Sequence, residues 1–244
     1  MRHSSAILAS LLLSLGVYAT PAGAAVVGVA GGNSAGMTAL LNSNGHAATD
    51  FGLAAPGAGM LAGFDALVLS RTPGNADVAS FVMGGGLLVT ELDAAEWALN
   101  TATLLNASAV GFTYINTGEP ITFTAAGVGA GLSNALSNPY SDWASTEFFM
   151  VFPTIGSGVD ILATRASGVA VAVGGASGAG RTLILGWDWQ DGGFDGLNNT
   201  ASEQLLLNAV NYQAGAAESV PEPASFAMLG LGLAALSTTR RRRS

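Results

Sequence analysis

The sequence predicts one α/β domain with a mostly parallel sheet, and two observations support this prediction. Short apolar runs without a polar face recur along the chain, as expected of strands that are buried on both sides. Segments with helical signals separate these runs, and the crossover connections of a parallel sheet place such helices on its faces. Cysteine is absent from the 244 residues, so packing alone must hold the fold together.

Strand and helix signals alternate in the first part of the chain. Residues 25–30 read Ala-Val-Val-Gly-Val-Ala and predict a first strand, followed by a helix over 34–41. A second buried strand is expected over 64–70. Asn75 then stands where an N-cap would begin a helix over 76–83. These elements form a strand–helix–strand–helix unit.

The next elements follow three glycines, which end the second helix at residue 83. A third strand is expected over 87–90, and Asp93 is expected to cap a helix over 94–105. The periodicity weakens between Gly111 and Val159. In that region the sequence indicates a strand over 121–124 and a loop over 134–143 that turns at Asn138-Pro139.

The last third of the chain regains clear signals. Strands are predicted over 160–164, 168–173 and 181–187, with a glycine-rich hairpin turn over 174–180. That turn is not a phosphate loop, because no Lys-Ser/Thr pair and no helix follow it. Ser202 is expected to cap a final helix over 203–211, whose apolar residues recur at three- and four-residue spacing.

Residues 64–70, 79–90 and 180–186, the last with its following helix, resemble the class I glutamine-amidotransferase-like fold, particularly its noncatalytic and ThuA-like branches. The resemblance implies a flavodoxin-like three-layer α/β domain over 25–215. Enzymes of that superfamily place a cysteine on a tight turn between strand and helix. This chain has no cysteine, so the resemblance implies a noncatalytic body.

Other nucleophiles find no support in the sequence. Thr90, Glu91 and Asp93 follow the third strand but lack the small-x-nucleophile-x-small pattern of an exposed elbow, so cap and surface roles are expected of them. His46 lies in a turn-like segment and is the one histidine beyond the N-terminal segment. No Gly-x-Ser-x-Gly elbow accompanies it, which argues against a serine hydrolase and for a surface histidine.

One polar and aromatic cluster follows the last predicted strand, where open α/β sheets bind ligands. Its carboxylates could hold calcium, its tryptophans could stack on a sugar ring or cover the core, and a plain structural loop is the third interpretation. No other cofactor is expected, and the metal is unknown. The candidate ligand-loop residues are Trp187, Asp188, Trp189, Asp191 and Asp195.

An alternative interpretation is that the protein is a carbohydrate-active hydrolase of the cell surface. Such an enzyme would need two carboxylates about 5 to 10 Å apart in a cleft, for example from Glu91 and Asp188. Trp143 and Glu147 lie near aromatic residues, a combination typical of sugar clefts and also of plain cores. Sequence spacing leaves both alternatives open, with the noncatalytic interpretation preferred.

The N-terminal segment 1–24 has the features of a secretory signal peptide. Arg2 and His3 form a short basic region, and an apolar, leucine-rich stretch follows. Ala22-Gly23-Ala24 then offers the small-x-small pattern that signal peptidase cuts. Cleavage is therefore expected after Ala24, so that the mature chain begins at Ala25.

The C-terminal segment 216–244 combines three features in a fixed order. Its prolines bias the backbone toward extended geometry, which suits recognition by a protease. An apolar helix expected from Ala224 would reach about 24 Å by Thr239, slightly short of the ~30 Å hydrocarbon core, and the following arginines should stay cytoplasmic. The signal residues are Val220, Pro221, Glu222, Pro223, Arg240, Arg241, Arg242 and Arg243.

This tail resembles the PEP-CTERM sorting signal of bacterial envelope proteins. The resemblance implies an exosortase as partner, transient anchoring in the inner membrane, and association with exopolysaccharide or the outer surface. An ordinary C-terminal membrane anchor is the alternative, although it gives no reason for Pro-Glu-Pro. The formal net charge of −8, with no lysine among the eight basic residues, argues against nucleic acid as a partner.

Overall fold

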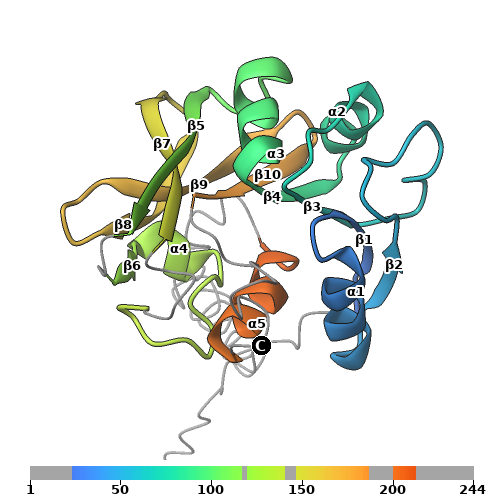
Figure 1. The fold of residues 1–244 in the computed structure, drawn as a ribbon, viewed down its shortest axis with the longest axis horizontal. Helices are drawn as coiled ribbons and strands as arrows, with labels where there is room; N and C mark the ends of the chain where they lie inside the picture. The colour runs from blue at the N-terminus through green and yellow to red at the C-terminus, as the bar shows by residue number, and fades with distance from the viewer. Residues whose placement is uncertain (1–23, 117–119, 141–146, 187–199, 213–244) are drawn as a thin grey trace, which may run out of the picture.

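The computed structural model describes residues 24–116, 120–140, 147–186 and 200–212, in which a mixed, eight-stranded sheet forms the centre (Figure 1). The strand order is β2-β1-β3-β4-β10-β9-β8-β6. Its first five strands pair in parallel, and the remaining pairings are antiparallel. The strands of this sheet are β1 Val26–Gly31, β2 Ala47–Asp50, β3 Ala66–Ser70, β4 Leu87–Glu91, β6 Ile121–Phe123, β8 Val159–Arg165, β9 Ala170–Ser177 and β10 Gly180–Leu185.

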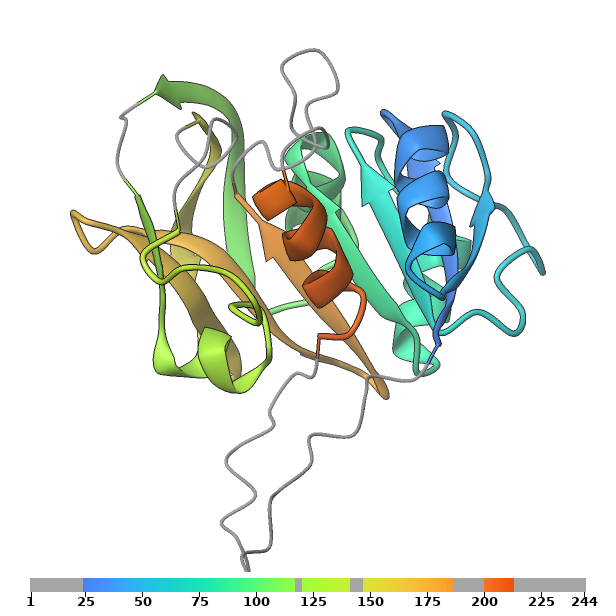
Figure 2. The same cartoon turned by 90° about the horizontal axis from the view of Figure 1, so that it is seen from below.

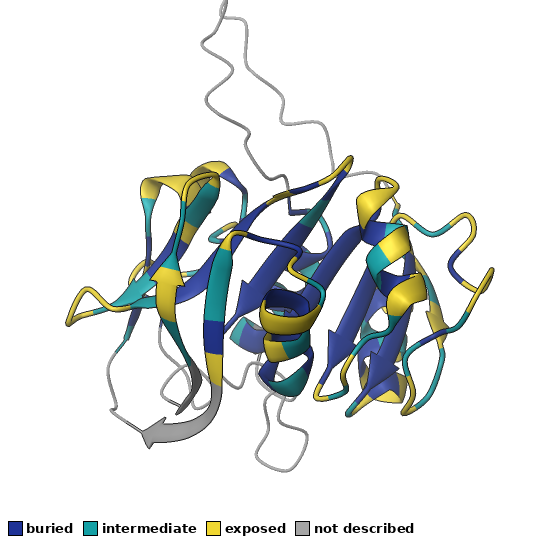
Figure 3. Ribbon diagram, turned by 90° about the horizontal axis from the view of Figure 1, so that it is seen from above, coloured by how far each residue is buried: buried dark blue, intermediate teal, exposed yellow. Residues whose placement is uncertain are grey.

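Helices cover both faces of the parallel half of the sheet, and Figure 2 shows α1 and α5 on one of them. One core cluster joins α1 and α5 to residues such as Val29, Val68 and Val89, while the other joins α2 and α3 to Leu67 and Leu88. The strands between them are buried on both faces (Figure 3). The helices are α1 Ser34–Ser43, α2 Ala76–Met83, α3 Leu92–Glu96, α4 Ala125–Gly129, α5 Thr200–Ala209 and the π-helical turn η1 Trp97–Thr101.

The predicted start of α2 is confirmed, whereas two other predicted caps are wrong. Asn75 Oδ1 accepts hydrogen bonds from the amides of Asp77 and Val78 at 2.9 and 3.0 Å. Helix α3 begins at Leu92, so Asp93 lies in its first turn and does not cap it. Ser202 lies inside α5 and is fully buried, with its hydroxyl 3.3 Å from that of Tyr140.

The glycine-rich segment after the eighth strand also differs from the prediction. Strand β9 continues through Gly174 and Gly175 to Ser177, and pairs with β10 along that whole length. The hairpin turn is therefore shorter than predicted. Gly174 suits this strand because a Cβ there would lie 2.4 Å from the hydroxyl of Tyr212, which packs over it.

Four elements of the structure lack a counterpart in the sequence prediction: β2, α4, β5 Ala107–Asn116 and β7 Glu147–Ile155. Strands β5 and β7 form a separate two-stranded antiparallel sheet with register shifts. Within the described residues, no helix has the length and apolar character needed to span a membrane.

Candidate functional site

The carboxyl ends of the parallel strands meet at one edge of the sheet, where open α/β folds bind ligands. Strand β3 ends at Ser70 and strand β4 ends at Glu91, and these two residues are paired across the strands. The described chain enters β1 and leaves α5 at the opposite edge (Figure 2). The candidate site therefore lies away from both ends of the body.

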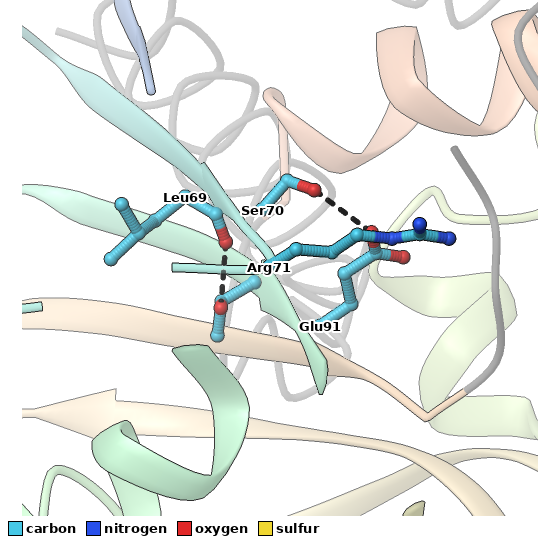
Figure 4. Close-up of polar contacts among 5 residues, drawn as sticks. Leu69, Ser70, Arg71 and Glu91 are labelled. Atoms are coloured by element: carbon cyan, nitrogen blue, oxygen red, sulfur yellow. Dashed lines mark hydrogen bonds and ion pairs between the residues drawn. The ribbon is translucent and has the colours of Figure 1, made fainter. Parts of the chain in front are cut away.

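Glu91 is the central residue of this site, and its side chain is fully buried. Its Oε1 atom accepts a hydrogen bond of 2.9 Å from Ser70 Oγ and lies 4.0 Å from Nε of Arg71 (Figure 4). Arg71 keeps 35% of its side chain exposed, so the carboxylate is buried while its cation reaches solvent. A buried carboxylate needs such partners because burial removes its hydration.

Thr90 is also buried, and its hydroxyl donates a hydrogen bond of 2.8 Å to the carbonyl oxygen of Leu69 on β3. Thr90 therefore has neither of the expected roles. Glu91 does occupy the N-cap position of α3, but its side chain makes no capping hydrogen bond and does not lie at the surface. Both side chains are buried because β4 lies between β3 and β10, and the two core clusters cover the faces of this part of the sheet. Asp93 alone of the three is partly exposed.

Three non-glycine residues with left-handed backbone geometry follow three neighbouring strands. Asn33 comes after β1 with φ 55°, Arg71 after β3 with φ 51° and Leu92 after β4 with φ 49°. Such residues are uncommon and concentrate at functional sites, where the surrounding structure holds them in place. Their clustering marks this edge as a specialised part of the fold.

Leu92 has the geometry of a nucleophile elbow without the nucleophile. It stands on the tight turn between strand β4 and helix α3, with the small residue Ala94 two positions after it and the β-branched Thr90 two positions before it. A nucleophile elbow combines such a strained turn with small residues on both sides, and here only Ala94 is of that kind. Here the side chain is a buried leucine, which carries no group that could attack a carbonyl.

Sequence reasoning missed Ser70, Arg71 and Leu92 as members of this site. The sequence gives only a weak signal for the turn at Leu92, because Ala94 has the small side chain that an elbow needs and Thr90 does not. The left-handed backbone of a leucine has no signature in the sequence. The Ser70–Glu91 contact depends on strand order, which the sequence did not determine.

His46 lies far from this edge, at the turn before β2, and is partly buried. Its Nδ1 accepts a hydrogen bond of 3.2 Å from the amide of Ala25. Burial lowers the pKa of the imidazole below its ordinary value. The histidine therefore interacts with the start of β1 and not with the candidate site.

A second concave region, of about 230 Å³, lies between α5 and the loop after α4. Asn208 donates hydrogen bonds to the carbonyl oxygens of Leu132 and Asn134 and accepts one from Gln204. These contacts fix the loop onto α5. Because the amide of Asn208 is used in holding the loop, the pocket is primarily a structural junction.

Several predicted site residues lie outside the described part of the chain. These are Trp143, the whole ligand loop from Trp187 to Asp195, Ala22 of the cleavage site and the C-terminal signal residues. Glu147 begins strand β7, and Ala24 is exposed. Among the described residues, no cluster of three or more histidine, cysteine or acidic side chains is arranged to hold a metal ion.

Comparison with known families identifies the tail. The model of the PEP-CTERM protein-sorting motif matches residues 219–243, which contain Val220 to Pro223 and the four arginines. This match confirms the predicted sorting signal. The motif implies an exported, cell-surface protein that an exosortase processes. No curated protein matches the chain in sequence.

Solved structures identify the fold of the body. A cytoplasmic protein of Salmonella typhimurium, STM3548, superposes with a TM-score of 0.55 at 13% identity, over 76% of this chain and 97% of its own. A putative GMP synthase protein of Thermoplasma acidophilum gives a TM-score of 0.53 at 11% identity, over 77% and 92%. An exo-β-1,4-mannosidase of Opitutaceae bacterium strain TAV5 gives 0.50 at 17%, over 78% of this chain and 36% of that chain.

These similarities confirm the predicted α/β class of the body, with a mixed and mostly parallel central sheet. At such low identity they establish the fold and nothing of its chemistry. The chain therefore carries a PEP-CTERM protein-sorting motif at residues 219–243, and its body is similar in fold to class I glutamine amidotransferase-like structures.

Proposed function

We propose that this protein displays a noncatalytic binding or structural body at the cell surface, in association with exopolysaccharide. Residues 1–24 act as a signal peptide for signal peptidase, residues 25–215 form the body, and residues 216–244 form the linker and sorting segment. The apolar helix of that segment holds the chain in the inner membrane until the exosortase acts. The PEP-CTERM motif supports this order of events.

The observation that carries the noncatalytic proposal is Leu92. The elbow after β4 keeps its left-handed turn, yet it presents a leucine where an amidotransferase-like enzyme would need a thiol or hydroxyl. The buried Glu91 beside it is bonded to Ser70 and lies near Arg71. A strained turn retained without a nucleophile is consistent with a site that binds and does not react.

The placement of the chain ends supports a display role. The first strand begins and the last helix ends at the edge of the sheet opposite Glu91 (Figure 2). A tether at either end therefore leaves the edge with Glu91, Arg71 and Leu92 free to face away from the attachment point. Such an orientation suits a body that contacts material outside the cell.

The proposal is tested with the exported protein and exopolysaccharide purified from the producing strain. The protein should sediment with the polymer, and Arg71→Ala should weaken this association while the variant Arg181→Ala, changed on β10, should not. The protein should hydrolyse neither glutamine nor p-nitrophenyl acetate. Association that Arg71→Ala leaves intact would place binding elsewhere, and turnover lost in Glu91→Gln would contradict the noncatalytic role.

A carbohydrate-active hydrolase is the second candidate, and the buried position of Glu91 favours it, because a general acid needs such an environment. This candidate requires a second carboxylate about 5 to 10 Å from Glu91. Asp188 is the proposed partner. Release of reducing sugar from the same polymer, abolished by Glu91→Gln and by Asp188→Asn, would establish it.

A further inference from the structure

The predicted cleavage point of the signal peptide lies directly before the first strand of the body. Ala24 is exposed, Ala25 is partly buried, and strand β1 begins at Val26. Ala25 is already held by the fold, because its carbonyl oxygen accepts a hydrogen bond of 2.9 Å from the amide of Ala47. The predicted mature N-terminus is therefore in direct contact with the body.

Two side chains accept hydrogen bonds from the backbone nitrogens at this point. His46 Nδ1 accepts from Ala25 N at 3.2 Å, and Asp65 Oδ2 accepts from Val26 N at 2.7 Å. Asp65 is itself fixed, because its amide donates a 2.8 Å hydrogen bond to the carbonyl oxygen of Val26. The imidazole lone pair of His46 thus lies next to the nitrogen of Ala25, and the carboxylate of Asp65 lies next to the nitrogen of Val26.

We propose that His46 and Asp65 form a docking site for the protein's own α-ammonium group, created when the signal peptide is removed. This inference rests on the cleavage after Ala24 proposed above. Hydrolysis of the Ala24–Ala25 peptide bond adds water, leaving a carboxylate on Ala24 and an amine on Ala25 that takes up a proton. The nitrogen that donated one hydrogen then carries a positive charge and three donors.

The surrounding charges favour this docking. Helix α1, which ends next to His46, contains no charged residue. On β2 the acid Asp50 lies at the far end, where it pairs with Val29. His46 and Asp65 are the titratable groups that accept hydrogen bonds from the start of the mature chain, and a hydrogen bond from an ammonium to such acceptors is stronger than one from a neutral amide.

The docking also depends on the protonation state of His46. Nδ1 accepts a hydrogen bond only while that nitrogen carries no proton, and a protonated imidazole would repel the ammonium. Burial already lowers the pKa of His46, which favours the neutral ring. The neutral imidazole of His46 can therefore accept a hydrogen bond from the α-ammonium group that cleavage creates on Ala25.

The absence of lysine makes a direct test possible, because the α-amine is then the sole primary amine of the mature chain. The full-length gene is expressed in the exporting host, and the exported protein is treated with N-hydroxysuccinimidyl acetate at pH 7. Docking predicts acetylation about tenfold slower in the native protein than in urea, as expected of a charge-assisted hydrogen bond. The variant His46→Leu should raise the native rate toward the unfolded rate.

Matched variants separate the docking from general unfolding. His46→Gln keeps a hydrogen-bond acceptor and should retain part of the protection, whereas Asp65→Asn should lose part of it. Asp77→Asn, the same change on the exposed first turn of α2, should leave the rate unchanged. Equal rates in native and unfolded protein that begins at Ala25 would overturn the docking alone. An N-terminus at another residue would overturn the cleavage and the docking together, and would leave the noncatalytic role of the body untouched.

Discussion

The central strands of the parallel half and the outer strands of the antiparallel half differ in how completely they are enclosed. In the parallel half, every residue of β3 and β4 is buried, and helices cover both faces. In the antiparallel half, β9 buries six of its eight residues, but the outer strand β8 buries only two of its seven. The short helix α4 packs on β8, and the β5–β7 sheet packs on β9 through β7. The enclosed half carries the candidate site at its carboxyl edge, because helices and strands there fix buried polar groups together.

The antiparallel half depends on close backbone contacts instead, and Gly127 tests this. A Cβ at Gly127 would lie 2.1 Å from the backbone carbonyl oxygen of Leu162, whereas a Cβ at Gly129 meets nothing within 4 Å. Gly127→Ala should therefore push α4 off β8 and destabilise the protein by about 3 kcal/mol. Gly129→Ala is the control, and it should be neutral or slightly stabilising because alanine favours a helix. Urea unfolding measures both.

Equal stability of the two alanine variants would contradict the importance of the α4–β8 contact. The antiparallel half would then tolerate displacement of α4, and the difference in tightness of packing between the two halves would be larger than we describe.

A polar contact tests the parallel half in the same way. Ser70→Ala removes the 2.9 Å hydrogen bond to the buried carboxylate of Glu91. Loss of a hydrogen bond to a charged buried group should cost about 2 kcal/mol. Ser80→Ala, on the exposed face of α2, should change stability little. A Ser70→Ala variant as stable as the Ser80→Ala variant in thermal unfolding would mean that the carboxylate does not depend on this donor.

The same contrast explains what the sequence could predict. Strands β3 and β4 were predicted within two residues of their observed bounds, because burial on both faces leaves an unbroken apolar run. The cap at Asn75 was predicted for a local reason, since a capping side chain bonds to its own helix. The sequence pattern is enough to predict an element when a local contact or continuous apolar burial determines that element.

The antiparallel half was predicted less well because its strands carry mixed residues. Strand β5 contains serine, glycine, threonine and asparagine, and its pairing with β7 shifts register twice. Gly174 and Gly175 indicate a turn by composition, but they lie in β9 because Tyr212 and Leu105 occupy the space above them. Leu92 escaped prediction for a similar reason, since tertiary packing imposes its backbone geometry.

Helix caps should contribute equally in both halves. Asn75 caps α2 in the parallel half, and Thr124 caps α4 in the antiparallel half, where its Oγ1 accepts from the amide of Gly127 at 3.2 Å. Each change to alanine should cost about 1 kcal/mol. Asn33→Gly should cost little, because Asn33 makes no capping hydrogen bond from its side chain and its φ of 55° suits glycine. The Thr124 hydroxyl also donates a 2.6 Å hydrogen bond to the carbonyl oxygen of Ile161 on β8, and a much larger loss at Thr124 would show that this bond matters more than the cap.

The smallest expected effect is a pH dependence at the outer edge of the parallel half. Burial lowers the pKa of His46 from 6.5, so the folded state favours the neutral ring. The stabilisation is present above pH 6.5 and is lost as the pH falls through the lowered pKa. The melting temperature of the unaltered protein should therefore drop relative to His46→Gln between about pH 7 and pH 5. Parallel melting curves for the two proteins would contradict this.

The account as a whole depends on the tail being a sorting signal and not a plain anchor. Replacing Pro221, Glu222 and Pro223 with alanine leaves the apolar helix and the arginines unchanged, so an anchor should function normally. Mass spectrometry of the surface fraction should find the unaltered protein without Arg240 to Ser244. The triple variant should remain full-length in the inner membrane. If both proteins keep Arg240 to Ser244 and fractionate alike, the tail is an anchor and the exosortase assignment is wrong.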